Sequence, residues 1–264
     1  MTHTPHRLEV KNISVGYAEK IIMHDLSFQV PHGARVAVVG PNGAGKSTLF
    51  KALVGLLPLK SGDIFIHGES LGAHKDCVAY VPQREEVDWR FPVTVNDVVM
   101  MGRFGQMGWF KRATSHDREL VRKSLEQMGM ADLAENSIGQ LSGGQQQRAF
   151  LARAIAQEPH ILLMDEPFTG VDVTTQEATL RLLDHLQDQK VTAIVSTHDL
   201  NLAASRFDLV LLLNHRLIAF GTPKEVFTNA NLASAFGNSL LIMENGMMLV
   251  DECCPPEEKF TSYD

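Results

Sequence analysis

Gly40-Pro41-Asn42-Gly43-Ala44-Gly45-Lys46-Ser47-Thr48 is the stretch of this 264-residue sequence that decides the fold. It matches the phosphate-loop pattern G-x-x-x-x-G-K-[ST], with an apolar run at residues 35–39 before it and a helical pattern to about Gly55 after it. Glycines let backbone N–H groups wrap a polyphosphate, and the following helix directs its positive end toward it. The sequence therefore predicts a nucleotide-binding α/β fold.

Two side chains of this loop have individual roles. Lys46 supplies a full positive charge to the β and γ oxygens of a triphosphate, and the Ser47 hydroxyl can be a ligand of Mg²⁺. ATP and Mg²⁺ are therefore the expected cofactors. The alternative is a glycine-rich turn that binds nothing, and the full pattern between a strand and a helix disfavours it.

An apolar strand pattern at residues 161–164 ends in two acidic residues, Asp165 and Glu166. Consecutive residues of a strand face opposite ways, so the two carboxylates are expected to have different roles. Asp165 is predicted to hold Mg²⁺, directly or through water, and Glu166 to orient or deprotonate the attacking water. Without the phosphate loop, a strand that ends in solvated acids would be the better interpretation.

The rest of the chain alternates strand and helix patterns. Residues 7–30 predict two antiparallel strands, and a helical, more polar pattern fills about residues 84–158. Further strands are predicted at 63–67, 78–81, 160–164, 191–196 and 209–213. Strands that alternate with helices form a parallel sheet covered on both faces. We therefore predict an α/β P-loop NTPase core, an N-terminal antiparallel β subdomain and an inserted α-helical subdomain.

The charge of the chain is concentrated at one end. The net charge is −7, and residues 251–264 supply five acids and one lysine, so we expect a disordered acidic tail after a domain at 1–250. This balance disfavours nucleic acid as a partner. No apolar run reaches the length of a bilayer span, and Met1 to Arg7 contains no apolar signal segment, so a cytoplasmic chain is expected.

The chain has three cysteines, Cys77, Cys253 and Cys254. An odd number without a secretory signal argues against a disulfide framework. The adjacent pair in the tail could bind a soft metal, but two ligands in a polar tail make a weak case, and reduced thiols are the simpler interpretation.

Leu141-Ser142-Gly143-Gly144-Gln145 identifies a family. Locally, Ser142 and Gln145 form a capping-box pattern, and the glycines expose N–H groups at a helix N-terminus, which suits an anion. Together with the two earlier motifs, this signature resembles that of ATP-binding cassette (ABC) ATPases, and the resemblance runs from about Leu8 to Thr222. It implies that two copies pair head to tail, so that the signature of one closes over ATP held by the other.

The resemblance also assigns roles to four single residues. Tyr17 is expected to stack on adenine, the alternative being a tyrosine of the core or of an edge strand. Gln83 resembles the glutamine that senses Mg²⁺, Asp172 the acid that communicates across the dimer, and His198 the histidine that contacts the γ-phosphate. One departure stands at Thr169-Gly170-Val171-Asp172, where many members have Ser-Ala-Leu-Asp, and the loop is expected to be looser there.

The segment from Gln83 to Val95 is the expected docking surface for a helix of a membrane partner, with Trp89 and Phe91 as anchors unless they pack internally. Met101-Gly102-Arg103, followed by Gly108-Trp109-Phe110-Lys111-Arg112, resembles the ATPases of bacterial manganese, zinc and iron importers. The resemblance implies integral-membrane permease subunits, an extracytoplasmic solute-binding protein and a place on the inner face of the bacterial membrane. A siderophore or vitamin importer and a soluble ABC ATPase of iron–sulfur cluster assembly remain as alternatives.

Overall fold

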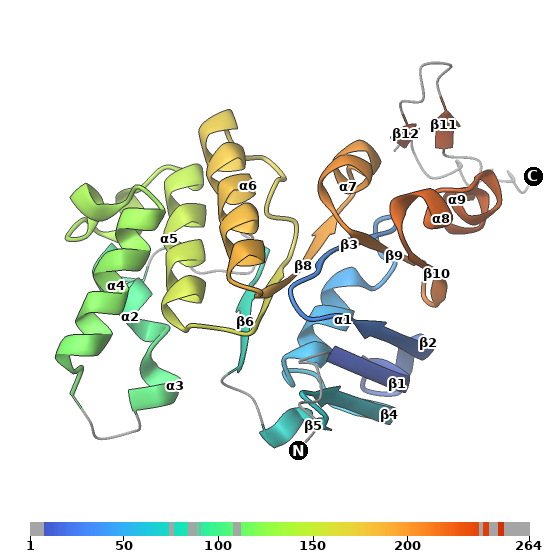
Figure 1. The fold of residues 1–264 in the computed structure, drawn as a ribbon, viewed down its shortest axis with the longest axis horizontal. Helices are drawn as coiled ribbons and strands as arrows, with labels where there is room; N and C mark the ends of the chain where they lie inside the picture. The colour runs from blue at the N-terminus through green and yellow to red at the C-terminus, as the bar shows by residue number, and fades with distance from the viewer. Residues whose placement is uncertain are drawn as a thin grey trace, which may run out of the picture.

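The computed structural model describes residues 8–73, 77–83, 89, 91–107, 112–237, 240–242 and 248–250 (Figure 1). The predictions for Cys253 and Cys254, for the acidic tail, for residues 84–88 and for Gly108–Lys111 lie outside these residues. Within the described part, no helix combines the length and the hydropathy that crossing a membrane requires.

A six-stranded sheet forms the centre of the molecule, in the order β10-β9-β3-β8-β7-β6. Five neighbouring strands are parallel, and β10 is antiparallel to β9 at one edge. The strands are β3 (Arg35–Val39), β6 (Val78–Val81), β7 (Ile161–Met164), β8 (Thr192–Thr197), β9 (Leu209–Leu213) and β10 (Leu217–Gly221). The predicted parallel core is thus confirmed, whereas the sequence patterns did not predict β10.

A second, antiparallel sheet has the order β2-β1-β4-β5. Its strands are β1 (Leu8–Tyr17), β2 (Lys20–Val30), β4 (Leu59–Ile66) and β5 (Glu69–Ser70). The two predicted N-terminal strands are confirmed, and β4 begins four residues before the predicted strand. Helix α1 (Lys46–Leu53) begins where the phosphate loop ends and stops two residues before the expected Gly55.

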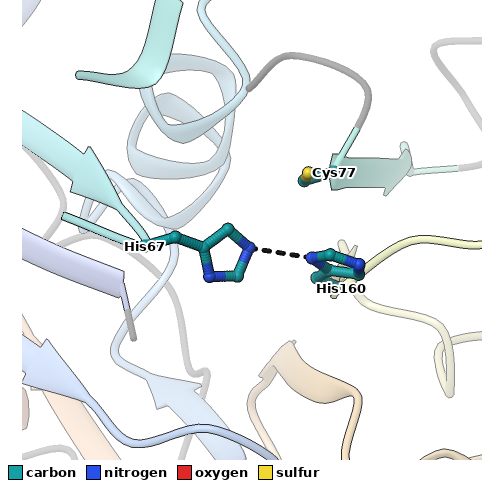
Figure 2. Close-up of side chains that lie close together, drawn as sticks. All are labelled: His67, Cys77 and His160. Atoms are coloured by element: carbon teal, nitrogen blue, oxygen red, sulfur yellow. Dashed lines mark hydrogen bonds between the residues drawn. The ribbon is translucent and has the colours of Figure 1, made fainter. Parts of the chain in front are cut away.

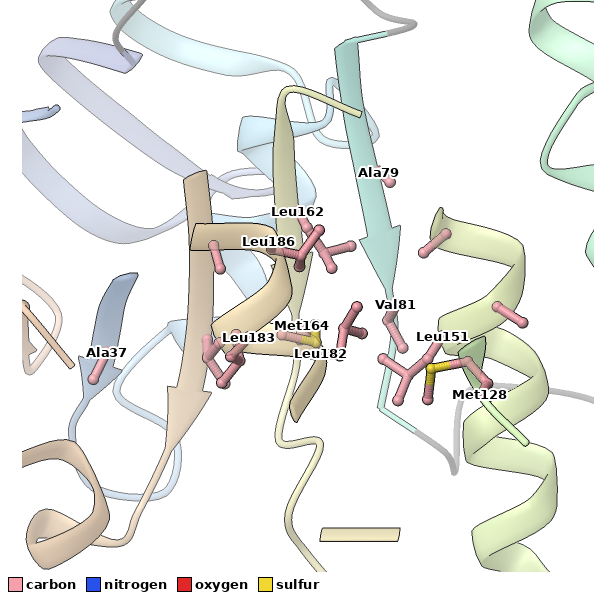
Figure 3. Packing of buried hydrophobic residues seen from close by; sticks show 14 of the residues in the cluster. Ala37, Ala79, Val81, Met128, Leu151, Leu162, Met164, Leu182, Leu183 and Leu186 are labelled. Atoms are coloured by element: carbon pink, nitrogen blue, oxygen red, sulfur yellow. The ribbon is translucent and has the colours of Figure 1, made fainter. Parts of the chain in front are cut away.

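Both faces of the central sheet are buried, as expected for parallel strands. In β3, Ala37 and Val39 pack into the core beneath α5 (Gly143–Ala156) and α6 (Val173–Asp188), while Val36 and Val38 face α1 and the antiparallel sheet. Figure 3 shows leucines of α6 packed over β7, and Leu151 of α5 beside β6. This alternation fixes the register of the sheet and therefore the positions where its loops begin.

The described residues between β6 and β7 are mainly helical, and we call α2–α5 the helical segment. It comprises α2 (Val95–Met101), α3 (Phe104–Met107), α4 (Ser115–Gln127), the 3₁₀ turns Ala131–Leu133 and Ile138–Gln140, and α5. The C-terminal elements are α7 (Leu200–Arg206), α8 (Pro223–Val226), α9 (Asn229–Phe236), β11 (Leu240–Ile242) and β12 (Met248–Val250), and the 3₁₀ turn Leu71–Ala73 follows β5. Capping boxes begin α2, α4 and α5, so local sequence determines where these helices start.

Arg103 joins the helices of this segment. Its buried guanidinium donates to Asp117 Oδ1 at 3.1 Å, to the Ala156 carbonyl oxygen at 2.8 Å and to Glu158 Oε2 at 3.1 Å. Hydrogen bonds from the side chain and backbone of Thr114, together with Arg103, lower the pKa of Asp117 to about 2. Arg103 thus contributes to the packing of α4 and α5 against each other.

Replacing Arg103 by leucine should destabilise the protein by about 3 kcal/mol, because the Asp117 carboxylate would remain buried without its counter-ion. Denaturant unfolding measures this, with Arg122→Leu as the matched control. Arg122 pairs with Glu119 and Glu126 on the exposed face of α4, where solvent screens the ion pairs, so their loss should change stability little. Equal losses in the two variants would contradict a stabilising role of the Arg103–Asp117 ion pair.

Because the pKa of Asp117 is lowered in the folded protein, the stabilising effect of its carboxylate should disappear in wild type as the pH falls from about 4 to about 2.

Candidate functional site

An open cavity of about 490 Å³ lies at the carboxyl ends of the parallel strands. Ligands of open α/β sheets bind at this edge. The lining comes from four separate parts of the sequence: Tyr17 and Ile22, the loop residues Asn42 to Thr48, Gln83, and Glu166. The structure therefore brings together residues that the sequence predicted separately, and Gly40 and Pro41 lead into the same loop.

The backbone of the phosphate loop requires glycine. Gly45 has φ of 101°, in the left-handed region, immediately before α1 begins at Lys46. This conformation is costly for residues with a Cβ atom. The first turn of α1 points its unpaired N–H groups into the loop, so the positive end of the helix faces the cavity.

Lys46 is held above this loop. Its side chain is 6% exposed, and Nζ donates to the carbonyl oxygens of Gly40 at 3.0 Å and Pro41 at 3.3 Å. Nζ also lies 3.5 Å from Glu166 Oε1. A cation between a loop of N–H donors and an acid fits a site for a triphosphate and the water that attacks it.

The two acidic residues after β7 have different surroundings. Asp165 is 1% exposed and accepts a hydrogen bond from Ser196 Oγ at 2.6 Å, and Tyr80 Oη lies 3.5 Å from its other oxygen. Glu166 reaches the cavity, and its own backbone has φ of 46°. Its N–H donates to Ser196 Oγ at 2.7 Å. One hydroxyl therefore joins both acidic residues.

Sequence reasoning missed Ser196. The available signal was a hydroxyl side chain within the buried strand β8, which pairs with β7 and ends beside Asp165. A buried hydroxyl needs a hydrogen-bond partner, and the acids at the end of the next strand supply two.

Ser196→Ala should lower kcat by about 10- to 100-fold while changing KM little, since a lost hydrogen bond to a charged group costs about 1.5–3 kcal/mol. Steady-state ATPase kinetics measure both constants, and Ser196→Thr should restore much of kcat. Ser124→Ala is the matched control, because this buried hydroxyl donates to the Leu120 carbonyl oxygen, far along the sequence from the site. An equal drop in kcat in Ser124→Ala, or wild-type kcat in Ser196→Ala, would contradict a positioning role for Ser196.

The residues around the cavity also fit Mg²⁺. Ser47 and Gln83 line it with a hydroxyl and an amide, and these hard oxygen donors, with carboxylates, are what Mg²⁺ prefers. Both oxygens of Asp165 already face protein hydroxyls, so contact through water suits this residue better than direct ligation.

Nine predicted site residues lie outside the described lining of this cavity. Gly40 and Pro41 precede the lining part of the phosphate loop, and Asp165 is buried next to Glu166. The other six are Asp172, His198, and the signature residues Ser142, Gly143, Gly144 and Gln145. His198 is exposed directly after β8. Asp172 caps α6 by accepting the Thr175 N–H at 2.8 Å, and this hydrogen bond is the main cause of its lowered pKa. Their assigned roles in nucleotide binding remain predictions.

The signature begins α5 with the predicted capping box. The Ser142 N–H donates to Gln145 Oε1 at 2.9 Å, and the Gln145 N–H donates to Ser142 Oγ at 3.3 Å. Gly144 is buried, and a Cβ atom there would lie 2.4 Å from both Asp172 Oδ2 and Thr175 Oγ1. Close packing against the start of α6 therefore gives Gly144 a second reason to be glycine.

The three aromatic residues with predicted contacts differ in their exposure. Tyr17 is 47% exposed at the end of β1 and lines the cavity, so it is not a core residue, and its stacking on adenine stays a prediction. Trp89 packs internally against Phe150, with ring centroids 4.9 Å apart. Phe91 is 60% exposed and remains available as a docking anchor.

Comparisons with known proteins agree with this geometry. The family described as "ABC transporter" matches residues 23–169. The chain is 46% identical to the manganese transport system ATP-binding protein MntB of Bacillus subtilis, over 91% of this chain and 96% of that protein. It is 44% identical to the zinc transport system ATP-binding protein TroB of Treponema pallidum, over 90% and 89%.

A solved structure is similar across nearly the same length. An ABC transporter of metal-chelate type in an inward-facing conformation has a TM-score of 0.78 and 29% identity, covering 93% of this chain and 97% of that one. The predicted fold class is thereby confirmed. With its phosphate loop, paired acids and signature, this chain belongs to the ABC transporter family and is an ABC-type ATPase.

Proposed function

We propose that this chain is the ATP-hydrolysing subunit of an importer for a divalent transition metal ion, of the manganese, zinc or iron class. The observation that carries the proposal is the high identity, over nine-tenths of the chain, to relatives named for manganese and zinc transport. The metal-chelate transporter of similar structure supports the same class. The transported ion is substrate of the whole assembly and need not contact this subunit.

Each residue at the cavity has a separate role in the proposed ATP hydrolysis. Lys46 binds the β and γ oxygens and neutralises charge as the γ-phosphoryl group leaves. Glu166 orients the attacking water and accepts its proton, while Ser196 holds the Glu166 backbone. Mg²⁺, when bound through Ser47, Gln83 and Asp165, supplies positive charge to the phosphate oxygens. Tyr17 offers its exposed ring to the adenine.

A complete site requires a second copy of the chain. The signature lies at the start of α5 and the phosphate loop at the start of α1, and these helices lie on opposite sides of β6 in Figure 1. Head-to-tail pairing would bring the partner's signature over the triphosphate, where Asp172 and His198 would also meet it. ATP then joins the two copies, and its hydrolysis releases them.

The proposed assembly includes permease subunits and, indirectly, an extracytoplasmic solute-binding protein. The chain would be cytoplasmic and peripheral to the inner face of the membrane. Phe91, at the edge of the helical segment, is the described residue that best suits a helix from the permease.

The test is uptake of radiolabelled manganese, zinc and iron by cells that carry the chain with its membrane partners. We expect uptake to require ATP hydrolysis and the chain to purify with integral membrane proteins. Ser142→Arg should fold and bind ATP but abolish both dimerisation and uptake, whereas Ser205→Arg, on exposed α7, should not. Transport of a siderophore or vitamin, and not of a metal ion, would favour a siderophore or vitamin importer.

A soluble ATPase without membrane partners would favour the iron–sulfur alternative. Deleting residues 251–264, with Cys253 and Cys254, distinguishes it. We expect ATPase activity and membrane recruitment to survive the deletion, and their loss would count against an importer subunit.

A further inference from the structure

We propose that His67, Cys77 and His160 bind a divalent transition metal ion of the zinc class, at a site separate from the nucleotide cavity (Figure 2). Each residue offers one ligand atom, and the three atoms lie within 4.8 Å of one another. Two imidazoles and a thiol are ligands that zinc favours, and three protein ligands leave a fourth tetrahedral position for water. This inference does not depend on which ion the assembly transports.

The two imidazoles already face each other. His67 Nε2 and His160 Nδ1 are 2.8 Å apart, and the rings meet edge to face with centroids 4.9 Å apart. This hydrogen bond needs one protonated and one unprotonated nitrogen, and a metal ion can replace the shared proton. Zinc at about 2.0–2.1 Å from each nitrogen in a tetrahedral site needs the two nitrogens about 3.3 Å apart, so they have to separate by about half an ångström.

The fold fixes two of the ligands on adjacent strands. Cys77 directly precedes β6 and His160 directly precedes β7, and the His160 N–H donates to the Cys77 carbonyl oxygen at 2.8 Å. The register of these parallel strands pairs Val78 with Ile161, so the residues before them are brought side by side. His67 approaches from the turn between β4 and β5 of the other sheet.

The location separates this cluster from the Mg²⁺ ligands. Cys77 and His160 stand at the amino ends of their strands, whereas the nucleotide cavity lies at the carboxyl ends. The ligand chemistry differs as well, because thiolate and imidazole select zinc-like ions while Mg²⁺ and Mn²⁺ prefer oxygen. All three side chains are partly or fully exposed, so an ion has a path to them.

A bound ion would join three parts of the molecule. His67 belongs to the antiparallel sheet, Cys77 and His160 to the central sheet, and His160 follows the end of α5 by four residues. At that end, Gln157 Nε2 donates to the Val78 carbonyl oxygen at 3.0 Å. The cluster therefore lies at the far end of the helix that begins with the signature.

The experiment titrates the full chain with cobalt and zinc, in a Cys253→Ser/Cys254→Ser background that removes the tail thiols. Cobalt should produce a sulfur-to-metal charge-transfer band that Cys77→Ser abolishes. Zinc should bind with a stoichiometry of one ion per chain. Its affinity, measured by competition with a chromophoric chelator, should fall at least about tenfold in His67→Ala and in His160→Ala. His116→Ala, on the exposed face of α4, is the matched control and should bind as the parent does.

Two outcomes would overturn the proposal. One is unchanged zinc affinity in a His67→Ala/His160→Ala double variant that retains the parental circular dichroism spectrum. The other is binding that disappears with the tail thiols alone. ATPase activity in Mg²⁺ and chelator should persist in the cluster variants, while Lys46→Ala should lose turnover and keep zinc, so the two sites can fail independently.

Discussion

Glu166→Gln should bind ATP normally, lose hydrolysis by at least about 10²–10³-fold and accumulate as an ATP-bound dimer. Glutamine keeps the size of the side chain but cannot accept the proton of the attacking water. The Ser196 contact to the Glu166 backbone would remain, so the loop should keep its shape. Phosphate release measures turnover, and light scattering with size-exclusion chromatography measures the dimer.

The matched control is Glu177→Gln, an exposed acid of α6 that pairs with Arg181. It should hydrolyse ATP at the wild-type rate and show no lasting dimer. A Glu166→Gln protein that stays monomeric with ATP and Mg²⁺ would contradict the sandwich arrangement. Wild-type turnover in that variant would remove Glu166 from the reaction.

Lys46→Ala should weaken ATP binding and reduce turnover by about 10²–10³-fold, because the site loses a buried positive charge placed at the phosphates. The loss also leaves the carbonyl oxygens of Gly40 and Pro41 without this donor, so the loop itself should loosen. A fluorescent ATP analogue reports the affinity, and phosphate release reports the rate.

Lys51→Ala serves as the control within the same helix, since Lys51 lies in the last turn of α1, away from the phosphate loop. It should change stability by less than about 1 kcal/mol and leave ATP affinity unaltered. Retained hydrolysis in Lys46→Ala would refute the role of this lysine.

Much of the fold followed from the sequence, because buried parallel strands are short apolar runs with turns beside them. The boundaries of β3, β6 and β9 agree with the predicted runs. The edge strand β10 was missed since all five of its residues are only partly buried and show no alternation. The division into domains remains a prediction.

Parts of the site could be predicted where all of the residues that form them are contiguous in the sequence. The phosphate loop and the signature cap are of this kind, and Glu166 followed from the strand before it. Ser196 and the contact between Gly144 and Asp172 depend on which strands and helices become neighbours. Hydrophobic pattern does not specify such pairings, so these partners became visible with the structure.

The packing of Gly144 against Asp172 has a kinetic consequence. In a dimer, the start of α5 would sense the neighbour's nucleotide, and the chain runs from Asp172 back to Glu166 in six residues. Occupancy of one site should therefore alter the rate at the other. We expect a sigmoidal dependence of velocity on ATP concentration, with a Hill coefficient above one, and a return toward hyperbolic behaviour when Gly144→Ala forces the two helices apart.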